Sequence, residues 1–469
     1  MNAIRSAGGF ADEQEANQVG SGAWTALSAG SNGFAGNLRT RLSALLRLTE
    51  MSKRIVIIGG GVIGLSTAYY CARRGWRVTV VERNPKQRDG CSFGNAGMVV
   101  PSHFVPLAAP GMVALGLKWM WNPASPFYIK PRWSRELLDW GLKFWRASTA
   151  EHVRRAAPLI RDLSFASRAC FEELAALPGN DFGLVKKGLL MLCKEPHTLD
   201  EEAKTAAQAR ALGIPAEVLD AKQTAALDPN VRMDIAGSVY FPQDCHLQPD
   251  RFLAGLQTQL KLLGTQFIWE REFVGWRAER DRRICAARIS DGREIEADEF
   301  IICGGSWSPA MAQGLGLKIP IQAGKGYSLT LPKPRQLPEI CAIFSEARVA
   351  ATPMGGRLRF AGTMEIAGLN EDINPVRVRG IINAVKKYYP EFEPTDFDGV
   401  QPWRGLRPCS PDGMPYVGRT AKFTNLSLAT GHAMMGLSLG PITGKLMAEI
   451  LAGEKSATDI ALLSPDRYG

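Results

Sequence analysis

A glycine-rich turn between a buried strand and a helix, near residue 60, constrains the fold more than any other feature of this chain. Four consecutive β-branched residues, 55–58, precede Gly59, Gly61 and Gly64, and a helix with small residues follows. Such an uninterrupted run is typical of a parallel strand covered on both faces. Strand, glycine turn and helix in this order predict the βαβ unit that binds a dinucleotide at a helix N-terminus.

Each glycine of this turn has its own predicted role. Gly59 permits the tight turn, Gly61 lets a pyrophosphate approach the backbone, and Gly64 lets the helix lie close to the strand. A second predicted strand, 76–81, ends in Glu82, whose carboxylate can accept hydrogen bonds from both ribose hydroxyls. An acid here argues against a 2′-phosphate, so FAD or NAD is favoured. The predicted contacts are Gly59, Gly61, Val62, Ile63, Gly64, Glu82 and Arg83.

The composition bounds the class of protein. The chain has 469 residues, 45% of them hydrophobic, which is enough for two or more domains, and it contains no run of 18 apolar residues. Nine cysteines without a C-x-x-C pair argue against a disulfide framework or a zinc site, so we expect no metal and a reducing, cytoplasmic location. The net charge of +10 comes without a long Lys/Arg block. A solvated basic surface and an anionic ligand or membrane both stay open, and we expect no nucleic acid.

Residues 1–50 differ from the rest of the chain. Ala, Gly, Ser and Asn dominate this segment, and apolar periodicity is missing before residue 42. We expect a mostly disordered extension, which is either a targeting tail or a stretch upstream of a natural start at Met51.

Residues 104–151 combine tryptophan with basic side chains. Tryptophan next to Lys and Arg is typical of a surface that contacts a membrane interface, and tryptophan equally fills ordinary cores. The helical spacing between Trp133 and Trp140 favours burial of at least half of these rings. Peripheral membrane contact through the others stays open. The five tryptophans are Trp119, Trp121, Trp133, Trp140 and Trp145.

Further glycine-containing segments are expected to reach the same nucleotide. Loop 91–100 is rich in small and amide-bearing residues, which suit a flat heterocycle, although an ordinary turn has the same composition. The buried strand 299–303 stops at Gly304 and Gly305, which let a second backbone pass close to the ligand. Near the C-terminus a strand, a turn at Gly431 and a helix follow one another, an arrangement that suits an anion.

Several motifs occur in order along residues 53–463. Together they resemble the FAD-dependent D-amino-acid dehydrogenases, which belong to the superfamily of D-amino-acid oxidase, glycine oxidase and sarcosine oxidase. The motifs are the glycine turn with its acid, Phe93-Gly-Asn-Ala-Gly97, Leu107-Ala-Ala-Pro-Gly111, Gly324-Lys-Gly-Tyr-Ser-Leu329, Gly405-Leu-Arg-Pro408, Pro411-Asp-Gly-Met-Pro415 and Thr430-Gly-His432.

The resemblance implies an α/β fold, in which a Rossmann-type FAD-binding domain carries an inserted α+β substrate domain with a mixed sheet. The sequence pattern agrees, because short alternating strands and turns between residues 320 and 400 contrast with the parallel pattern at the start. We expect residues 51–105, 236–320 and 401–469 to form the FAD-binding domain, and residues 106–235 and 321–400 to form the substrate domain.

The resemblance also implies one noncovalently bound FAD, with the ADP half on the first glycine turn and Glu82. Backbone N–H groups at a helix N-terminus would stabilise the negative charge that develops on the reduced flavin ring. The implied neighbours are Ser92, Asn95, Ala96 and Gly97 along the flavin, Gly304 and Gly305 near the pyrophosphate, and Gly431, His432 and Gly436 at the pyrimidine edge.

The carboxylate-binding arginine of the family corresponds to Arg407 in the Gly-Leu-Arg-Pro motif. A guanidinium offers a planar, bidentate fork for an α-carboxylate, which lysine lacks. Tyr327 and Lys325 are candidates for completing this clamp or the flavin face, with core or surface positions as the alternative. His103, near the flavin loop in sequence, is a further catalytic candidate, and His432 is expected to be structural.

These implications predict oxidative deamination of a D-amino acid, in which hydride passes from Cα to flavin N5 and electrons go on to a quinone-like acceptor. A D-proline or D-hydroxyproline dehydrogenase and a glycine- or sarcosine-type oxidase are alternatives within the superfamily. A noncatalytic basic flavoprotein that binds membrane or nucleic acid is the alternative from another class. Localisation at the inner face of the cytoplasmic membrane would suit a quinone acceptor.

Overall fold

The computed structural model describes residues 52–87, 89–120, 125–130, 132–279 and 281–469. Lys53–Gly469 forms one compact unit. The expected disorder of residues 1–50 lies outside the described residues. Within the described part of the chain, no helix is both long enough and apolar enough to span a bilayer.

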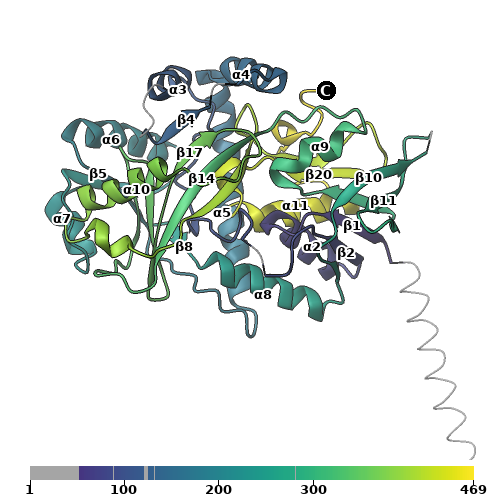
Figure 1. The fold of residues 1–469 in the computed structure, drawn as a ribbon, viewed down its shortest axis with the longest axis horizontal. Coiled ribbons are helices and arrows are strands. Elements are labelled where there is room, and N and C mark those ends of the chain that lie inside the picture. Colours follow the sequence, from purple (N-terminus) through teal and green to yellow (C-terminus); the bar gives the residue numbers. More distant parts are fainter. Residues whose placement is uncertain (1–51, 88, 121–124, 131, 280) are drawn as a thin grey trace, which may run out of the picture. The chain divides into compact units, whose positions relative to one another are not determined.

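The predicted glycine turn follows a central strand of a six-stranded sheet (Figure 1). Its strands, in order across the sheet, are β19 (Tyr416–Arg419), β20 (Leu426–Thr430), β13 (Glu299–Ile302), β1 (Arg54–Ile58), β2 (Arg77–Val81) and β9 (Gln266–Ile268). All neighbours are parallel except β19 and β20. The central strand β1 pairs in parallel with β2 and β13, as its run of four β-branched residues favours.

The alternation of side chains along β1 builds two apolar layers. Ile55 and Ile57 pack against helices α2 (Val62–Arg73), α5 (Ala150–Ala175), α8 (Pro249–Leu262) and α11 (Gly440–Ala452). Val56 and Ile58 point to the other face, where a three-stranded sheet covers them. The strands of that sheet are β10 (Phe273–Ala278), β11 (Ile284–Ile289) and β12 (Glu294–Glu296), and α9 (Ser308–Gln313) lies beside it.

A nine-stranded mixed sheet forms the other half of the compact unit (Figure 1). Its order is β18 (Trp403–Cys409), β14 (Gln322–Leu331), β17 (Arg357–Ile366), β16 (Val349–Met354), β15 (Cys341–Phe344), β5 (Leu189–Cys193), β7 (Gly237–Phe241) and β6 (Glu217–Asp220), and β4 (Phe127–Ile129) pairs with β17. Helix α10 (Pro375–Tyr388) covers a core on one face of β14 and β17. This sheet therefore has its own core.

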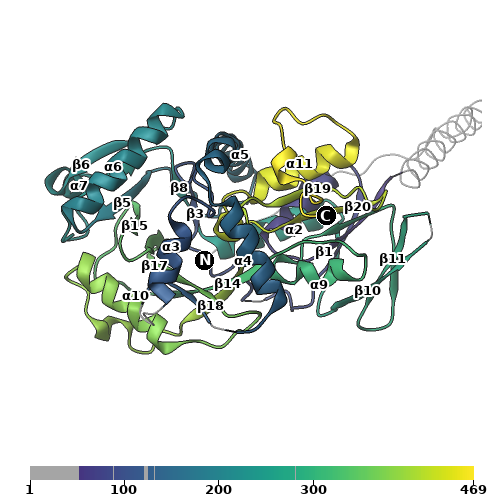
Figure 2. The same cartoon turned by 90° about the horizontal axis from the view of Figure 1, so that it is seen from above.

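The remaining described elements lie at the edges of these layers. They are the β3–β8 ribbon (Met98–Val99 with Cys245–His246), α6 (Pro196–Ala211), α7 (Ala221–Leu227), α3 (Met112–Met120) and α4 (Arg135–Ala147). Figures 1 and 2 show α3 and α4 on one outer side, next to β14 and β17.

The mixed α/β fold class is confirmed, and most expected elements occur within a few residues of their predicted ends. Among the strands that were not predicted, β18 contains the Gly-Leu-Arg-Pro motif. The division into two domains stays a prediction. The strands β7 and β18 lie in segments assigned to the FAD-binding domain, and they pair within the larger sheet.

The tryptophans of residues 104–151 divide between core and surface. Trp140 is buried and donates from Nε1 to the Cys409 carbonyl, 2.9 Å away. Trp133 and Trp145 are exposed. Trp121 lies outside the described residues, as does the side chain of Trp119. Burial is therefore established for one ring and exposure for two.

Candidate active site

A cavity of about 360 Å³ opens where the carboxyl ends of β1, β2, β13 and β20 meet. Ligands of open α/β sheets bind at this edge. Eleven of the sixteen predicted cofactor residues line the cavity, although they come from distant parts of the chain. They are Gly59, Gly61, Val62, Ile63, Glu82, Arg83, Ser92, Asn95, Gly304, Gly305 and His432.

The glycines of the first turn act in different ways. A Cβ on Gly64 would lie 1.9 Å from the Gly59 carbonyl oxygen, so this position is closed to any side chain. A Cβ on Gly61 would meet only Ser92 Oγ, at 3.4 Å, so the protein itself leaves room there. Ser92 Oγ also accepts a hydrogen bond of 3.0 Å from the Val62 N–H at the start of α2. The turn thus keeps space for a ligand at a helix N-terminus.

Glu82 is fixed at the end of β2. Its carboxylate accepts hydrogen bonds from the backbone N–H groups of Gly60, at 2.7 Å, and Asn84, at 3.0 Å. The neighbouring Arg83 guanidinium lies over the Trp307 ring, 3.7 Å from its centre. Arg83 and Trp307 both line the cavity. Trp307 is therefore part of the cavity wall, although the sequence analysis did not identify it.

The loop after β2 is held by the larger sheet. The buried Arg359 guanidinium donates to the carbonyls of Phe93, at 3.2 Å, and Asn95, at 2.7 Å. Burial lowers the pKa of Arg359 to about 10. From the edge strand β18, the Trp403 ring fills the space where a Cβ of Gly94 would lie, and its Nε1 donates to a loop carbonyl. This loop, which carries the predicted flavin contacts, is therefore positioned by residues far away in sequence.

His432 contributes to the cavity wall from the turn after β20. Its Nε2 pairs with Thr443 Oγ1 at 2.9 Å, which fits the structural role expected of it. Burial lowers its pKa to about 3, so the ring is neutral. Its Nδ1 is buried and has no hydrogen-bond partner among the described residues. The predicted contacts that do not line the cavity are Gly64, Ala96, Gly97, Gly431 and Gly436.

Arg407 lies on β18 between Leu406 and Pro408, which line the cavity, but Arg407 itself is not among the lining residues. Its Nη1 donates to the Thr363 carbonyl at 2.8 Å, and its guanidinium occupies the space above Gly326, whose Cβ would lie 2.1 Å from Nη1. Within the described residues, no Asp or Glu forms an ion pair with it. Burial lowers the pKa of this guanidinium.

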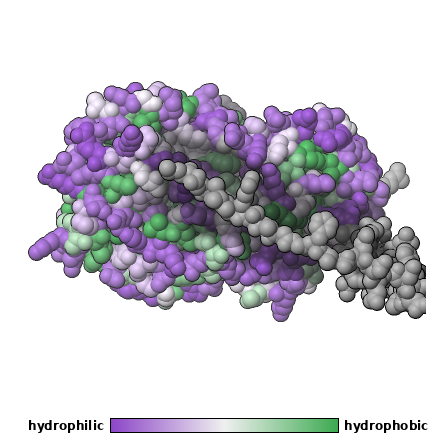
Figure 3. Space-filling view, turned by 90° about the horizontal axis from the view of Figure 1, so that it is seen from below, coloured by the Kyte–Doolittle hydropathy of each residue, from purple (hydrophilic) through white to green (hydrophobic). Residues whose placement is uncertain are grey.

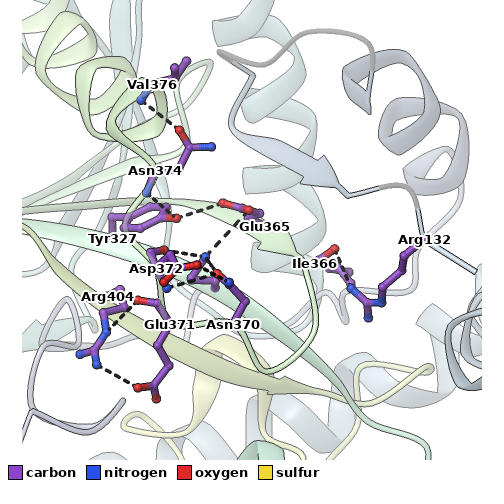
Figure 4. Close-up of polar contacts among 11 residues, drawn as sticks. Arg132, Tyr327, Glu365, Ile366, Asn370, Glu371, Asp372, Asn374, Val376 and Arg404 are labelled. Atoms are coloured by element: carbon purple, nitrogen blue, oxygen red, sulfur yellow. Dashed lines mark hydrogen bonds and ion pairs between the residues drawn. The ribbon is translucent and has the colours of Figure 1, made fainter. Parts of the chain in front are cut away.

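Lys325 and Tyr327 do not share a site with Arg407. Side chains alternate along a strand, and Gly326 between them faces the Arg407 guanidinium, so Lys325 and Tyr327 point to the opposite face. There the Tyr327 hydroxyl donates to Glu365 at 3.0 Å (Figure 4). Both side chains are buried and neither lines the cavity. The expected three-residue clamp is thus corrected, and the alternative that they are core residues fits the structure.

The same buried face holds the loop after β17 in place. Lys325 Nζ donates to Asn370 Oδ1 at 2.6 Å and to the Asp372 carbonyl at 2.7 Å. Arg404 donates to Glu371 at 3.0 Å, and Figure 4 shows Asn370, Glu371 and Asp372 together on the loop beside Arg404. Arg404 and Glu371 both line the cavity. Lys325 therefore supports a wall of the cavity and does not enter it.

His103 is also separated from the cavity. Its Nδ1 lies 3.0 Å from Ser102 Oγ, and Ser102 in turn hydrogen-bonds to the buried Asp244. Burial lowers the pKa of His103 to about 4 and raises the pKa of Asp244 to about 7. The catalytic candidacy of His103 rested on closeness in sequence to the flavin loop, and its contacts instead fix the chain behind β3.

A dinucleotide cavity at the edge of a Rossmann-type sheet, in a chain that also forms a large mixed sheet, defines an enzyme that uses a nucleotide cofactor. The family model described as FAD dependent oxidoreductase matches residues 54–450. The D-amino acid dehydrogenases of Bradyrhizobium diazoefficiens and Paramagnetospirillum magneticum are each 31% identical to this chain, over 424 and 421 residues. In both cases the match covers 88% of this chain and 99% of the relative.

Solved structures share the fold. Glycine oxidase from Geobacillus kaustophilus has a TM-score of 0.70 at 22% identity, covering 89% of this chain and 99% of its own. L-proline dehydrogenase from P. horikoshii has a TM-score of 0.68 at 16% identity, covering 89% and 98%. The chain belongs to the FAD-dependent oxidoreductase family and is an FAD enzyme.

The residues of this chain fit the cofactor. The space beyond Gly61 at the start of α2 suits a pyrophosphate, and Glu82 stands at the end of β2, where a ribose binds in such folds. His432 lines the same cavity. The individual contacts remain proposals.

Proposed function

We propose that this enzyme oxidises the Cα–N bond of D-amino acids, and that Arg407 binds the substrate carboxylate. The observation that carries the proposal is a largely buried guanidinium with no acidic partner in the described chain, on the strand that contributes Leu406 and Pro408 to the cavity wall. A buried cation is costly unless it is paired, so an incoming carboxylate would supply the missing anion. Relatives named D-amino acid dehydrogenase support this class of substrate.

Arg407 is held so that it can orient a ligand. A guanidinium carries five N–H donors, and the bond from Nη1 to the Thr363 carbonyl uses one of them. The remaining donors can hold a carboxylate in two parallel hydrogen bonds, which fix its rotation as well as its position. Burial lowers the pKa of Arg407, yet an arginine stays charged at neutral pH. The clamp therefore needs neither Lys325 nor Tyr327.

Bound FAD would supply the two-electron acceptor for the hydride that leaves Cα; the amine nitrogen would lose a proton, and water would hydrolyse the imino acid to a keto acid and ammonia. The contribution of the chain is orientation. Arg407 holds the carboxylate, while Arg359 and Trp403 hold the loop with the predicted flavin contacts. Orientation of this kind lowers the barrier without a side-chain base.

We further propose that the electrons pass to a quinone-like acceptor and that the enzyme works in the cytoplasm, in peripheral contact with the inner face of the cytoplasmic membrane. The free thiol state of all nine cysteines suits a reducing compartment. A lipid-soluble acceptor would require the protein to approach a bilayer surface.

Anaerobic mixing of the purified holoenzyme with single amino acids tests the substrate class. D-Alanine and other D-amino acids should bleach the flavin and sustain reduction of a soluble dye, whereas L-alanine should do neither. Preference for D-proline or D-hydroxyproline would indicate a secondary-amine dehydrogenase, and preference for glycine or sarcosine would indicate the oxidase branch. A flavin that stays oxidised with every amine would contradict the proposal and support a noncatalytic flavoprotein.

A further inference from the structure

Helix α4 presents an apolar face to solvent. Leu138, Leu142 and Trp145 follow one another at helical spacing on one side, and their exposed fractions are 62%, 46% and 61%. Trp133, just before the helix, is 98% exposed. Single exposed apolar residues are common on soluble proteins, but four large ones within 13 residues make a patch.

The exposure is a property of one face, because the other face of α4 is anchored. Trp140 is buried, stacks on Phe144 and donates to the Cys409 carbonyl of β18. Upstream, Arg132 donates to Gln322 Oε1 at 2.8 Å. Figure 4 shows its contact with the Ile366 carbonyl. The helix is thus firmly fixed with its outer apolar stripe turned away from the protein.

The charge around α4 indicates which kind of partner this face would bind. Residues 118–155 contain eight Lys or Arg and three Asp or Glu, so this stretch carries a surplus of five positive charges out of the net +10 of the whole chain. Arg135 and Arg146 are exposed at the two ends of the helix. An apolar stripe with tryptophan, flanked by cations, matches an interface of anionic lipid, where apolar side chains enter the acyl boundary and cations meet the headgroups.

We infer that the outer face of α4 (Trp133, Leu138, Leu142 and Trp145) docks on an anionic lipid bilayer. Docking in this way would place β18, the strand of Arg407, about one helix diameter, roughly 10 Å, from the lipid. The inference depends on the proposed function in one respect only, which is that the electrons pass to a lipid-soluble acceptor. Figure 3 shows the molecule from the side opposite to α3 and α4, where hydrophilic residues predominate and hydrophobic residues form small separate groups.

The test compares two triple variants of the full-length holoenzyme. Leu138→Gln/Leu142→Gln/Trp145→Gln removes the stripe, and Leu262→Gln/Leu263→Gln/Val274→Gln removes three exposed apolar residues from α8 and β10 as the matched control. Each is sedimented with vesicles of phosphatidylglycerol and phosphatidylcholine and with vesicles of phosphatidylcholine alone. Dye-linked activity, flavin content and molar mass are measured on the same preparations.

The parent and the control should bind the anionic vesicles and largely fail to bind the neutral ones. The α4 variant should bind about tenfold more weakly or worse, with flavin content and dye-linked activity unchanged. Equal binding by all three proteins, or no binding by the parent, would overturn the inference. A parent dimer that becomes a monomer in the α4 variant would overturn it in favour of a second copy of the chain. Vesicle binding without any amine oxidation would instead sink the proposed function alone.

Discussion

Arg407 on β18 donates a hydrogen bond of 2.8 Å to the carbonyl of Thr363 on β17, across the intervening strand β14. The bond is possible because Gly326 on β14 has no side chain to block the guanidinium. Thr363 has a φ of +62°, which turns its carbonyl out of the regular ladder at an irregularity in the pairing of β14 and β17. A β-branched residue in this region is strained, and such strain clusters at functional sites.

Thr363→Gly should relieve this strain. Glycine adopts positive φ without a steric cost, so the free energy of unfolding should rise by about 1 kcal/mol after the entropy cost of glycine is subtracted. The looser carbonyl should hold Arg407 less firmly, so kcat/KM for the amino acid should fall several-fold. Denaturant unfolding and steady-state kinetics measure the two effects. A loss of stability larger than 1 kcal/mol would show that Thr363 is not strained.

Gly326→Ala should displace Arg407 without touching the cofactor turn. The new Cβ would overlap the guanidinium, with Nη1, Nη2 and Cζ all within 2.3 Å, so the side chain must swing away. We expect KM for the amino acid to rise about tenfold or more while FAD content is retained. Gly275→Ala on β10, where a Cβ would meet nothing within 4 Å, is the matched control. Equal KM values for the amino acid in the two variants would show that Arg407 does not bind the substrate from the position above Gly326.

Two glycines of the first turn should respond differently to the same added methyl group. Gly61→Ala leaves the folded chain room, so the apoprotein should fold, but FAD should bind at least about tenfold more weakly because the methyl group meets the pyrophosphate. Gly64→Ala should lower stability as well, since its Cβ would overlap the Gly59 carbonyl. Circular dichroism and FAD titration separate the effects. Full FAD affinity in Gly61→Ala would refute the assignment of this turn.

The free energy of unfolding should depend on pH through the protonation of His246. Burial lowers its pKa from 6.5 to about 4, so the unfolded state takes up the proton first as the pH falls. The stability from this group is complete above pH 6.5 and is lost as the pH falls toward 4. The loss approaches about 1.4 kcal/mol per pH unit between those values. His246→Leu should therefore flatten the fall in unfolding free energy measured at several pH values in this window, and parallel curves would disprove the point.

The sequence predicted the cofactor turn well because its determinants are local. A strand, three glycines and an acid lie within 30 residues, and each can be recognised from its own neighbours. The positions of Trp403 and Arg359, which hold the flavin loop, depend on contacts across more than 260 residues, and no sequence periodicity predicts such contacts.

Lys325 and Tyr327 show where the sequence pattern was insufficient. Their spacing correctly placed both side chains on one face of a strand, but alternation does not say which face meets the cavity. Gly326, between them, could have indicated which face meets Arg407. A glycine opposite the Gly-Leu-Arg-Pro strand leaves room for a large side chain from that strand. His103 failed for a related reason, because closeness in sequence to the flavin loop did not reveal Ser102 and Asp244.

Arg407→Lys tests the central claim most directly, through kcat/KM for a D-amino acid, FAD content and turnover of an amine without a carboxylate. Lysine keeps the charge but loses the bidentate fork, so kcat/KM for the amino acid should fall roughly 30- to 1000-fold, corresponding to about 2 to 4 kcal/mol. FAD content and the slow turnover of the simple amine should not change. Full activity toward D-amino acids, or loss of FAD, would contradict the assignment of Arg407 as the carboxylate anchor.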